Sequence, residues 1–158
     1  MKIILGSASP RRKDLLKEIF DEFEIIPSNF DEDSIKQDET NPGKLVETLS
    51  KCKGEEVFSR IKLEEDCIII SSDTMVFCKE RLLGKPKDKD DVRRMITMLS
   101  NKTHIVVTGV YLICKEFTKS FKSITEVTFA NMTEEEINDY CELTTIYDKA
   151  GAYAIQED

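Results

Sequence analysis

The sequence predicts an α/β fold in which helices flank a mixed β-sheet, and three observations lead to this prediction. Strand-like and helix-like segments alternate along the 158 residues, as they do in α/β proteins. With 40% hydrophobic residues, a chain of this length can bury one sizeable core. Neither an internal repeat nor a linker rich in Pro, Gly or Ser divides the sequence. We therefore expect one compact domain over residues 1–158.

The chain begins with a predicted strand and a predicted helix. Residues 2–7 are mainly apolar and form the strand, whereas residues 10–23 carry apolar residues at helical spacing. Ser9 is the expected N-cap, and Pro10 suits the first helical turn. The expected apolar face consists of Leu15, Leu16, Ile19, Phe20 and Phe23.

A loop and a longer helix come next. Residues 31–40 are acidic and polar, which predicts a loop. Asn41 and Pro42 then begin a helix, and Gly54 is expected to weaken its middle. The apolar residues of this helix are Leu45, Leu49, Cys52 and Val57.

The middle of the chain predicts a strand that contains a polar island. Residues 67–78 are strand-like, yet residues 71–74 read Ser-Ser-Asp-Thr between apolar ends. The Gly-Lys-Pro sequence at 84–86 predicts a turn, after which Asp88 can cap another helix. The apolar face of that helix consists of Val92, Met95, Ile96 and Leu99.

The last third of the chain predicts two strands and a short helix. Residues 104–114 and 119–131 are expected to form adjacent strands, which makes the sheet mixed. Thr133 and Glu136 then form a capping-box pattern for a helix that ends at Tyr140.

Charge and hydrophobic pattern exclude several classes of protein. Asp and Glu outnumber Lys and Arg by 31 to 23, and the net charge of -8 argues against a broad nucleic-acid-binding surface. The apolar runs are well short of the ~18 residues that a membrane span needs. Residues 1–6 resemble an opening strand rather than a signal peptide. We therefore expect a cytoplasmic protein with no nucleic-acid or membrane partner.

The cysteines and the single histidine do not suggest metal or thiol chemistry. The five cysteines are scattered without a C-x-x-C pair, so we expect buried free thiols. His104 stands at the head of an apolar strand, which favours a structural role. Catalysis is then expected to depend on carboxylates, Lys, Arg and hydroxyl groups.

The junction between the first strand and the first helix has the composition of an anion-binding site. Ser7 and Ser9 contribute hydroxyls, Arg11 and Arg12 contribute guanidinium groups, and the helix N-terminus offers free amide hydrogens. The alternative is an ordinary capped helix with two solvated arginines. Because the dipole disfavours cations at a helix N-terminus, the arginines hint at a bound phosphate.

Asp73 is the most unusual residue of the predicted strands. An ionised carboxylate in an apolar strand is costly unless it is paired, hydrogen-bonded or bound to a metal. The alternative is an exposed position at the sheet edge, or hydrogen bonds to the neighbouring hydroxyls. We favour a functional role, because α/β proteins place ligands at strand ends.

Three further charged positions are candidates, each with a simpler alternative. Lys53 borders the apolar face of its helix and can reach inward. Lys85 is held on a turn, although a solvated turn lysine is common. Glu32 belongs to the acidic cluster at 31–33, which suits either a hard cation or a solvated loop. The small residues of 148–156 suit a ligand-packed segment or a tight turn.

Five ordered motifs of this sequence resemble the Maf family of nucleotide pyrophosphatases. They are Ser-Ala-Ser-Pro-Arg-Arg at 7–12, Ser-Asp-Thr at 72–74, Gly-Lys-Pro at 84–86, and the segments 103–110 and 149–156. The resemblance extends in register from the first strand to the last residue, and five motifs together are far more specific than one.

The resemblance implies a fold and an activity. The fold is an elongated α/β structure similar to that of inosine triphosphate pyrophosphatases, with two lobes and a central cleft, usually as a homodimer. The activity is hydrolysis of a nucleoside triphosphate to its monophosphate and pyrophosphate, dependent on magnesium or manganese. A nucleotide-binding regulator of cell division with little turnover is the alternative. A receiver-like phosphoacceptor domain is more distant, since Ser-Pro-Arg-Arg has no role there.

The resemblance also implies residue roles. By position, Asp73 matches the catalytic carboxylate, Lys53 and Lys85 the active-site lysines, and Glu32 an acidic residue of the metal site. Asp73 can act as the base or, with Glu32 as the base, as a metal ligand, and we favour Asp73 as the base. The expected substrate-binding residues are Ser7, Ser9, Arg11, Arg12, Thr74 and Gln156.

Three of these positions indicate the branch of the family. Arg11, Thr74 and Gln156 resemble the branch that acts on dTTP and UTP, whereas the 7-methyl-GTP branch typically has Trp, Gln and a different closing segment. Two positions depart from the family pattern. Gly54 stands where Ala is usual, and the sequence stops at Asp158 where family members continue, so we expect a domain that lacks the C-terminal strand and helix.

Overall fold

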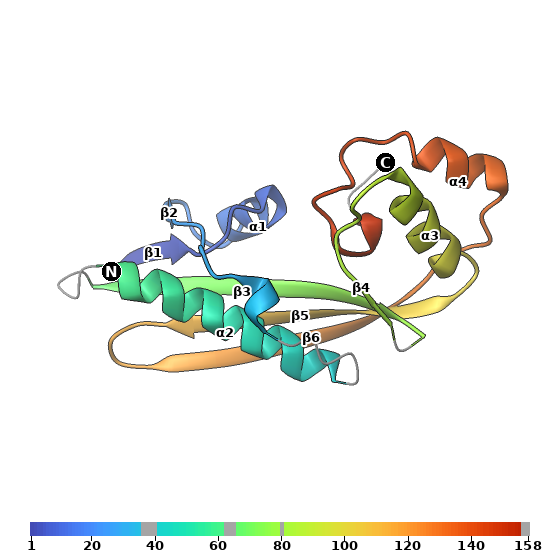
Figure 1. Cartoon of the computed structure of the whole chain (residues 1–158). Helices are drawn as coiled ribbons and strands as arrows, with labels where there is room; N and C mark the ends of the chain where they lie inside the picture. Colours follow the sequence, from blue (N-terminus) through green and yellow to red (C-terminus); the bar gives the residue numbers. More distant parts are fainter. Residues whose placement is uncertain (36–40, 62–65, 80, 156–158) are drawn as a thin grey trace. The chain divides into compact units, whose positions relative to one another are not determined.

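The computed structural model describes residues 1–35, 41–61, 66–79 and 81–155, and these form the predicted mixed α/β fold (Figure 1). The strands are β1 Lys2–Leu5, β2 Glu24–Ile25, β3 Cys67–Cys78, β4 Arg81–Leu83, β5 Thr103–Ile113 and β6 Thr118–Thr128. The helices are α1 Pro10–Lys17, α2 Pro42–Arg60, α3 Lys89–Leu99 and α4 Glu134–Tyr140, with 3-10 turns η1 Glu32–Ser34 and η2 Ala150–Ala152.

The six strands of the described residues form one mixed sheet in the order β2-β1-β3-β5-β6, and β4 pairs with β3. β1 runs parallel to both neighbours, so that Ile4 faces Glu24 of β2 and Ile69 of β3. β4 runs antiparallel to β3, with Leu83 beside Val76. The prediction of a mixed sheet is therefore confirmed.

The chain forms two compact units, which we describe separately. Unit 1 contains Met1–Asp73 and Thr108–Ser123, and unit 2 contains Thr74–Val107 and Ile124–Asp158. The two-lobed arrangement with a central cleft stays a prediction from the family resemblance.

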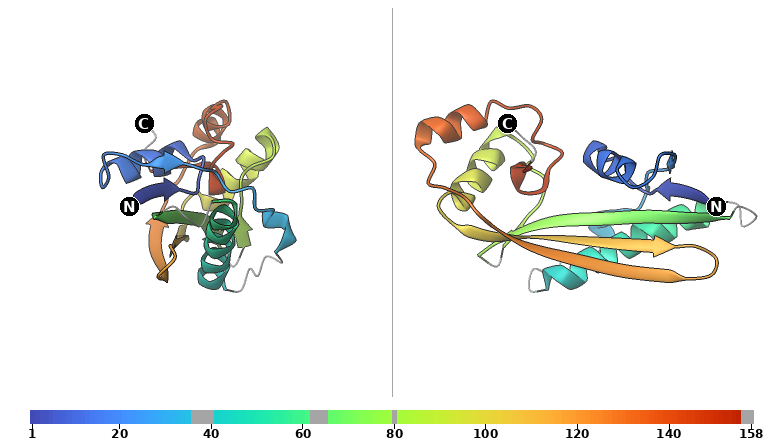
Figure 2. Two further views of the ribbon diagram at one scale, coloured as in Figure 1. Left: turned by 90° about the vertical axis from the view of Figure 1, so that its left-hand side faces the viewer. Right: turned by 180° about the vertical axis from the view of Figure 1, so that it is seen from behind.

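In unit 1, α2 lies along one face of the sheet (Figures 1 and 2). Gly109 of β5 makes this close packing possible, because a Cβ there would lie 2.5 Å from the carbonyl oxygen of Val46. The core between the helix and the sheet contains Ile4, Val57, Cys67, Ile69, Tyr111 and Ile113. The Thr-Gly-Val sequence at 108–110 thus has a packing role in addition to its place in a family motif.

Gly54 has a different role from the one expected from helix propensity. A Cβ at this position would lie 2.6 Å from the hydroxyl oxygen of Ser71 and 2.8 Å from the ring of Tyr111. The glycine therefore lets α2 approach β3 and β5 closely, and its cost to the helix is offset by this contact.

α1 ends at Lys17, well before the predicted end at Phe23. The reason is the parallel pairing of β2 with β1, which places Ile25 beside Leu5 and leaves the residues between Lys17 and Glu24 to reverse the chain. The expected apolar face is correspondingly incomplete, because Leu16 is buried whereas Leu15 and Ile19 are exposed.

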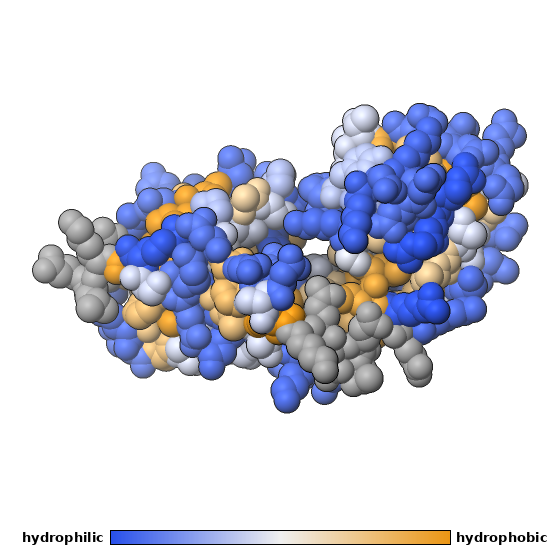
Figure 3. Space-filling view, in the orientation of Figure 1, coloured by the Kyte–Doolittle hydropathy of each residue, from blue (hydrophilic) through white to orange (hydrophobic). Residues whose placement is uncertain are grey.

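Unit 2 is built around α3. Its four predicted apolar residues Val92, Met95, Ile96 and Leu99 are all buried, in one cluster with Val76, Leu83, Ile137 and Cys141. Asp88 caps α3 and accepts a hydrogen bond from the Asp91 amide, and Thr133 and Glu136 form the predicted capping box of α4. Hydrophilic residues cover most of the outer surface of α3 and α4 in Figure 3, as expected for amphipathic helices.

The five cysteines are free thiols, as the sequence predicted. Cys52 is half-buried, and the other four are buried. Among the helices that the structure describes, none has the length and apolar content required to cross a membrane.

Candidate functional site in unit 1

Most of the polar island of β3 is buried. Ser71, Ser72 and Asp73 are at most 8% exposed. The Ser71 hydroxyl donates 2.7 Å to the Ser50 carbonyl of α2 and also approaches the Tyr111 carbonyl of β5 at 3.4 Å. Ser71 therefore connects the helix to the sheet. Because its hydroxyl is directed at these carbonyl groups, the charge of Asp73 must be balanced by other groups.

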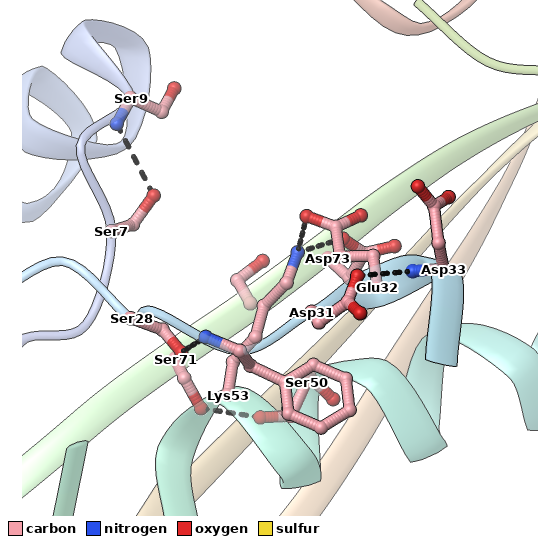
Figure 4. A network of polar contacts seen from close by, with 12 residues as sticks. Ser7, Ser9, Ser28, Asp31, Glu32, Asp33, Ser50, Lys53, Ser71 and Asp73 are labelled. Atoms are coloured by element: carbon pink, nitrogen blue, oxygen red, sulfur yellow. Dashed lines mark hydrogen bonds and ion pairs between the residues drawn. The ribbon is translucent and has the colours of Figure 1, made fainter. Parts of the chain in front are cut away.

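Lys53, a residue of α2, balances the charge of Asp73. Its Nζ lies 2.5 Å from Asp73 Oδ1 and 2.9 Å from Glu32 Oε1, so one ammonium group bridges two carboxylates (Figure 4). The Lys53 side chain is only 12% exposed, as its place beside the apolar face of α2 predicted. Lys51, two residues earlier, is exposed and lies 3.8 Å from Glu55.

One residue of the acidic cluster at 31–33 contacts Lys53, whereas the other two interact with each other within the loop. Asp31 Oδ1 accepts a hydrogen bond of 3.1 Å from the Asp33 amide and thereby caps η1. This turn presents Glu32 toward Lys53, and the Glu32 side chain is 48% exposed. Asp31 and Asp33 behave as the solvated-loop interpretation predicted.

One carboxylate oxygen of Asp73 is not engaged by the described residues. Asp73 Oδ2 is buried, and no described residue forms a hydrogen bond with it. Burial raises the pKa of the Asp73 carboxyl group above its ordinary value, while the charge of Lys53 opposes this rise. A carboxylate of this kind can accept a proton or coordinate a cation through Oδ2.

The strand-to-helix junction is organised by Ser7 and Arg12. The Ser7 hydroxyl accepts hydrogen bonds of 3.2 Å from the Ser9 amide and from Arg12 Nη1. Arg12 Nη1 also donates 2.8 Å to the carbonyl of Ser72, one residue before Asp73. Ser9 occupies the N-cap position as predicted, but its side chain forms no capping hydrogen bond in the described structure.

Arg12 is therefore part of the site rather than a solvated arginine. Burial lowers the pKa of its guanidinium group, and the charges of Asp73 and Glu32 oppose this effect. Its bond to the Ser72 carbonyl also gives a structural reason for a cation in the first turn of α1, independent of a bound phosphate. Arg11 beside it is half-buried.

The other predicted site residues lie outside this cluster. Thr74, the next residue of β3, is half-buried, and Lys85 is exposed on its turn; both belong to unit 2. Gln156 lies outside the described residues. The structure thus brings together Asp73, Lys53 and Glu32, with Ser7 and Arg12 joined to the same strand, whereas the approach of Lys85, Thr74 and Gln156 to Asp73 stays a prediction.

Comparison with known proteins gives the family. The sequence model of the family described as Maf-like protein matches residues 2–158. This chain belongs to the Maf-like family. The match includes every residue of the cluster around Asp73.

Relatives of this Maf-like protein include curated enzymes. A protein of Carboxydothermus hydrogenoformans named dTTP/UTP pyrophosphatase is 43% identical over 158 residues, covering 99% of this chain and 82% of the relative. A Bacillus cereus protein of the same name is 43% identical over 155 residues, covering 98% and 78%. Among solved structures, the Staphylococcus aureus Ham1 protein is 17% identical with a TM-score of 0.46, covering 80% of this chain and 70% of that one.

Proposed function

We propose that this Maf-like protein hydrolyses dTTP and UTP to the nucleoside monophosphate and pyrophosphate. The observation that carries the proposal is the Asp73–Lys53–Glu32 cluster, in which Asp73 is buried and Glu32 is partly exposed. It occurs in a chain that is 43% identical to relatives named dTTP/UTP pyrophosphatase. Such a cluster combines a carboxylate that can accept a proton with an ammonium group that can offset phosphate charge.

The two carboxylates also suit a divalent metal ion. Among the described residues there is no group of three or more His, Cys, Asp or Glu side chains placed to hold a metal. Mg²⁺, however, is commonly held by one or two carboxylates together with substrate phosphates and water. Glu32 fits that requirement when Asp73 acts as the base, and Asp73 Oδ2 fits it when Glu32 does. A bound Mg²⁺ or Mn²⁺ would offset phosphate charge.

Asp73 is the proposed general base. Its carboxylate takes a proton from a water molecule, whose oxygen forms a bond to the α-phosphorus as the bond to the α,β-bridging oxygen breaks. Pyrophosphate leaves with that bridging oxygen. Lys53 holds Asp73 in place through its 2.5 Å contact. The positive charges of Lys53, Lys85, Arg11 and Arg12 offset charge on the phosphates.

Glu32 is the alternative base, with Asp73 as a metal ligand. Two observations favour Asp73. Its pKa is raised by burial, which makes the carboxylate a better proton acceptor at neutral pH, and Oδ2 is unused by the described residues. Glu32 is half-exposed and belongs to a short 3-10 turn, which suits a ligand for a solvated cation.

A panel of nucleoside triphosphates tests the proposed substrate. We expect kcat/KM for dTTP and UTP to exceed that for ATP, GTP and 7-methyl-GTP by roughly 10-fold or more, because an unpaired polar group in a base pocket costs ~1–3 kcal/mol. Equal efficiency with GTP and UTP contradicts the pyrimidine assignment.

Chelation tests the proposed metal requirement. EDTA should abolish activity, and Mg²⁺ or Mn²⁺ should restore it. Undiminished hydrolysis in EDTA contradicts the metal requirement.

The same panel separates the enzyme from a regulator. A protein that binds dTTP or UTP tightly but releases no pyrophosphate at any metal concentration would support the alternative of a nucleotide-binding regulator of cell division. Binding is measured by calorimetry and release by a pyrophosphate assay on the same preparation.

A further inference from the structure

The segment Lys149–Tyr153 of unit 2 is held in an unusual backbone conformation. Gly151 and Ala152 have φ angles of 70° and 63°, so two consecutive residues lie in the left-handed region. Glycine adopts this conformation readily, but an alanine there costs about 1–2 kcal/mol. Ala152 is fully buried within the core cluster around α3. The surrounding structure must therefore enforce this conformation.

Two hydroxyl groups provide much of that restraint. Tyr140, the last residue of α4, donates a hydrogen bond of 2.9 Å to the Ala152 carbonyl. The Tyr153 hydroxyl lies 2.5 Å from Nε2 of His104 in β5. The rings of His104, Tyr153 and Phe129 pack edge to face, with centroids 4.8–5.4 Å apart. His104, which is 3% exposed, thus anchors the end of the segment to the sheet.

The restrained segment contacts the turn that carries Lys85. The Gly151 amide donates a hydrogen bond of 3.0 Å to the carbonyl of Gly84, the residue before Lys85. Leu83 and Pro86 on either side of this turn are buried, whereas the Lys85 side chain is exposed. The backbone of Lys85 is therefore fixed while its ammonium group is available to a ligand.

We propose that His104 and Tyr153 are positioning residues that act through the Gly151 amide on the Gly84–Lys85 turn. The proposal extends the structural role of His104 to the proposed reaction, and it rests on the proposed function of Lys85. The hydrogen bond between the Tyr153 hydroxyl and His104 Nε2 fixes Ala152 and Gly151, and through them the backbone of Lys85. Burial keeps both groups neutral, because it lowers the pKa of His104 and raises the pKa of Tyr153 to about 12.

Tyr153→Phe tests the proposal, because it removes the hydroxyl and keeps the ring. We expect kcat for UTP to fall roughly 2- to 10-fold with little change in KM, which is the size expected for one lost hydrogen bond. The Gly151 amide should exchange faster by a similar factor in NMR, while the Ser100 amide, bonded 2.9 Å from the Ile96 carbonyl, should be unchanged. Tyr147→Phe, the same change at an exposed tyrosine of unit 2, is the matched control and should alter neither quantity.

A double-mutant cycle shows whether the effect passes through Lys85. In a Lys85→Gln background, Tyr153→Phe should have no further effect on kcat, because the group that it positions is gone. An equal loss in both backgrounds would overturn the proposal, as would unchanged exchange at Gly151. His104→Gln, whose amide group can accept from or donate to the Tyr153 hydroxyl, should retain most of kcat, and His104→Leu should behave like Tyr153→Phe.

The exchange measurement keeps this proposal distinct from the proposed function. If the wild-type protein hydrolyses no nucleoside triphosphate, the proposed function fails. Faster exchange of Gly151 in Tyr153→Phe would then still establish the restraint on the Gly84–Lys85 turn, and unchanged exchange would refute it.

Discussion

Replacement of Asp73 by Asn is expected to lower kcat for UTP about 10³-fold, because it removes the proposed base without a change of volume. The fold should tolerate the change. Burial raises the pKa of the Asp73 carboxyl group, so its charged form is costly in the folded protein, and a neutral amide avoids that cost. Lys53 keeps its contact of 2.9 Å with Glu32. Thermal unfolding should therefore be unchanged or shifted upward.

Asp14→Asn is the matched control for Asp73→Asn. Asp14 is an exposed residue of α1 that lies 3.7 Å from Lys17, and its replacement should leave kcat and the melting temperature unchanged. Steady-state kinetics and thermal unfolding of the two variants decide the assignment. Near-normal kcat in Asp73→Asn would refute Asp73 as the base.

Replacement of Lys53 by Met should have the second-largest effect, and it should act on both activity and stability. Loss of the ammonium group leaves Asp73 buried without its ion-pair partner, which we expect to cost about 3–5 kcal/mol of unfolding free energy at neutral pH. Activity should fall by about 10²- to 10³-fold, because charge stabilisation near the phosphates is lost as well. Lys51→Met, the same change at an exposed position of α2, is the control and should be close to neutral.

The loss of unfolding free energy caused by Lys53→Met should depend on pH in a defined direction. Lys53 lowers the pKa of the Asp73 carboxyl group, so its removal raises that pKa further above the value in the unfolded chain. Between the unfolded and the folded pKa, the folded state binds more protons than the unfolded state, and unfolding free energy falls as pH rises. The variant should therefore lose less stability at acidic pH than at neutral pH. The acid limb of kcat/KM should also move to higher pH.

Chemical denaturation at several pH values measures this effect. A stability difference between Lys53→Met and the wild type that stays constant from neutral to acidic pH would show that Lys53 does not control the ionisation of Asp73.

Much of the fold could be predicted because local signals agree with the tertiary structure. The apolar spacing of α3 matches its buried face, and Asp88 and Thr133 cap the helices that they were expected to begin. α1 differs because its end is set by the pairing of β2 with β1, which depends on contacts between distant residues. The packing role of Gly54 could not be predicted for the same reason, since its effect on the helix is local but its contact with Ser71 is not.

The candidate site could be predicted in part. A carboxylate in an apolar strand signals Asp73 directly, and the helical position of Lys53 predicts that it points inward. The hydrogen bond from Arg12 to the Ser72 carbonyl could not be predicted. Its acceptor is a backbone group 60 residues away, and every residue has such a group whatever its side chain. The hydrogen bond between the Gly151 amide and the Gly84 carbonyl could not be predicted for the same reason, since both partners are backbone groups.

Hydrolysis of UTP in ¹⁸O-labelled water tests the central claim most directly, since it identifies the phosphorus atom that water attacks. Attack at the α-phosphorus, as proposed for the water activated by Asp73, places the label in UMP and leaves the released pyrophosphate unlabelled. Mass spectrometry of both products after a single turnover distinguishes the possible sites of attack. Label in UMP alone is the predicted result, and label in pyrophosphate or in inorganic phosphate would contradict the account.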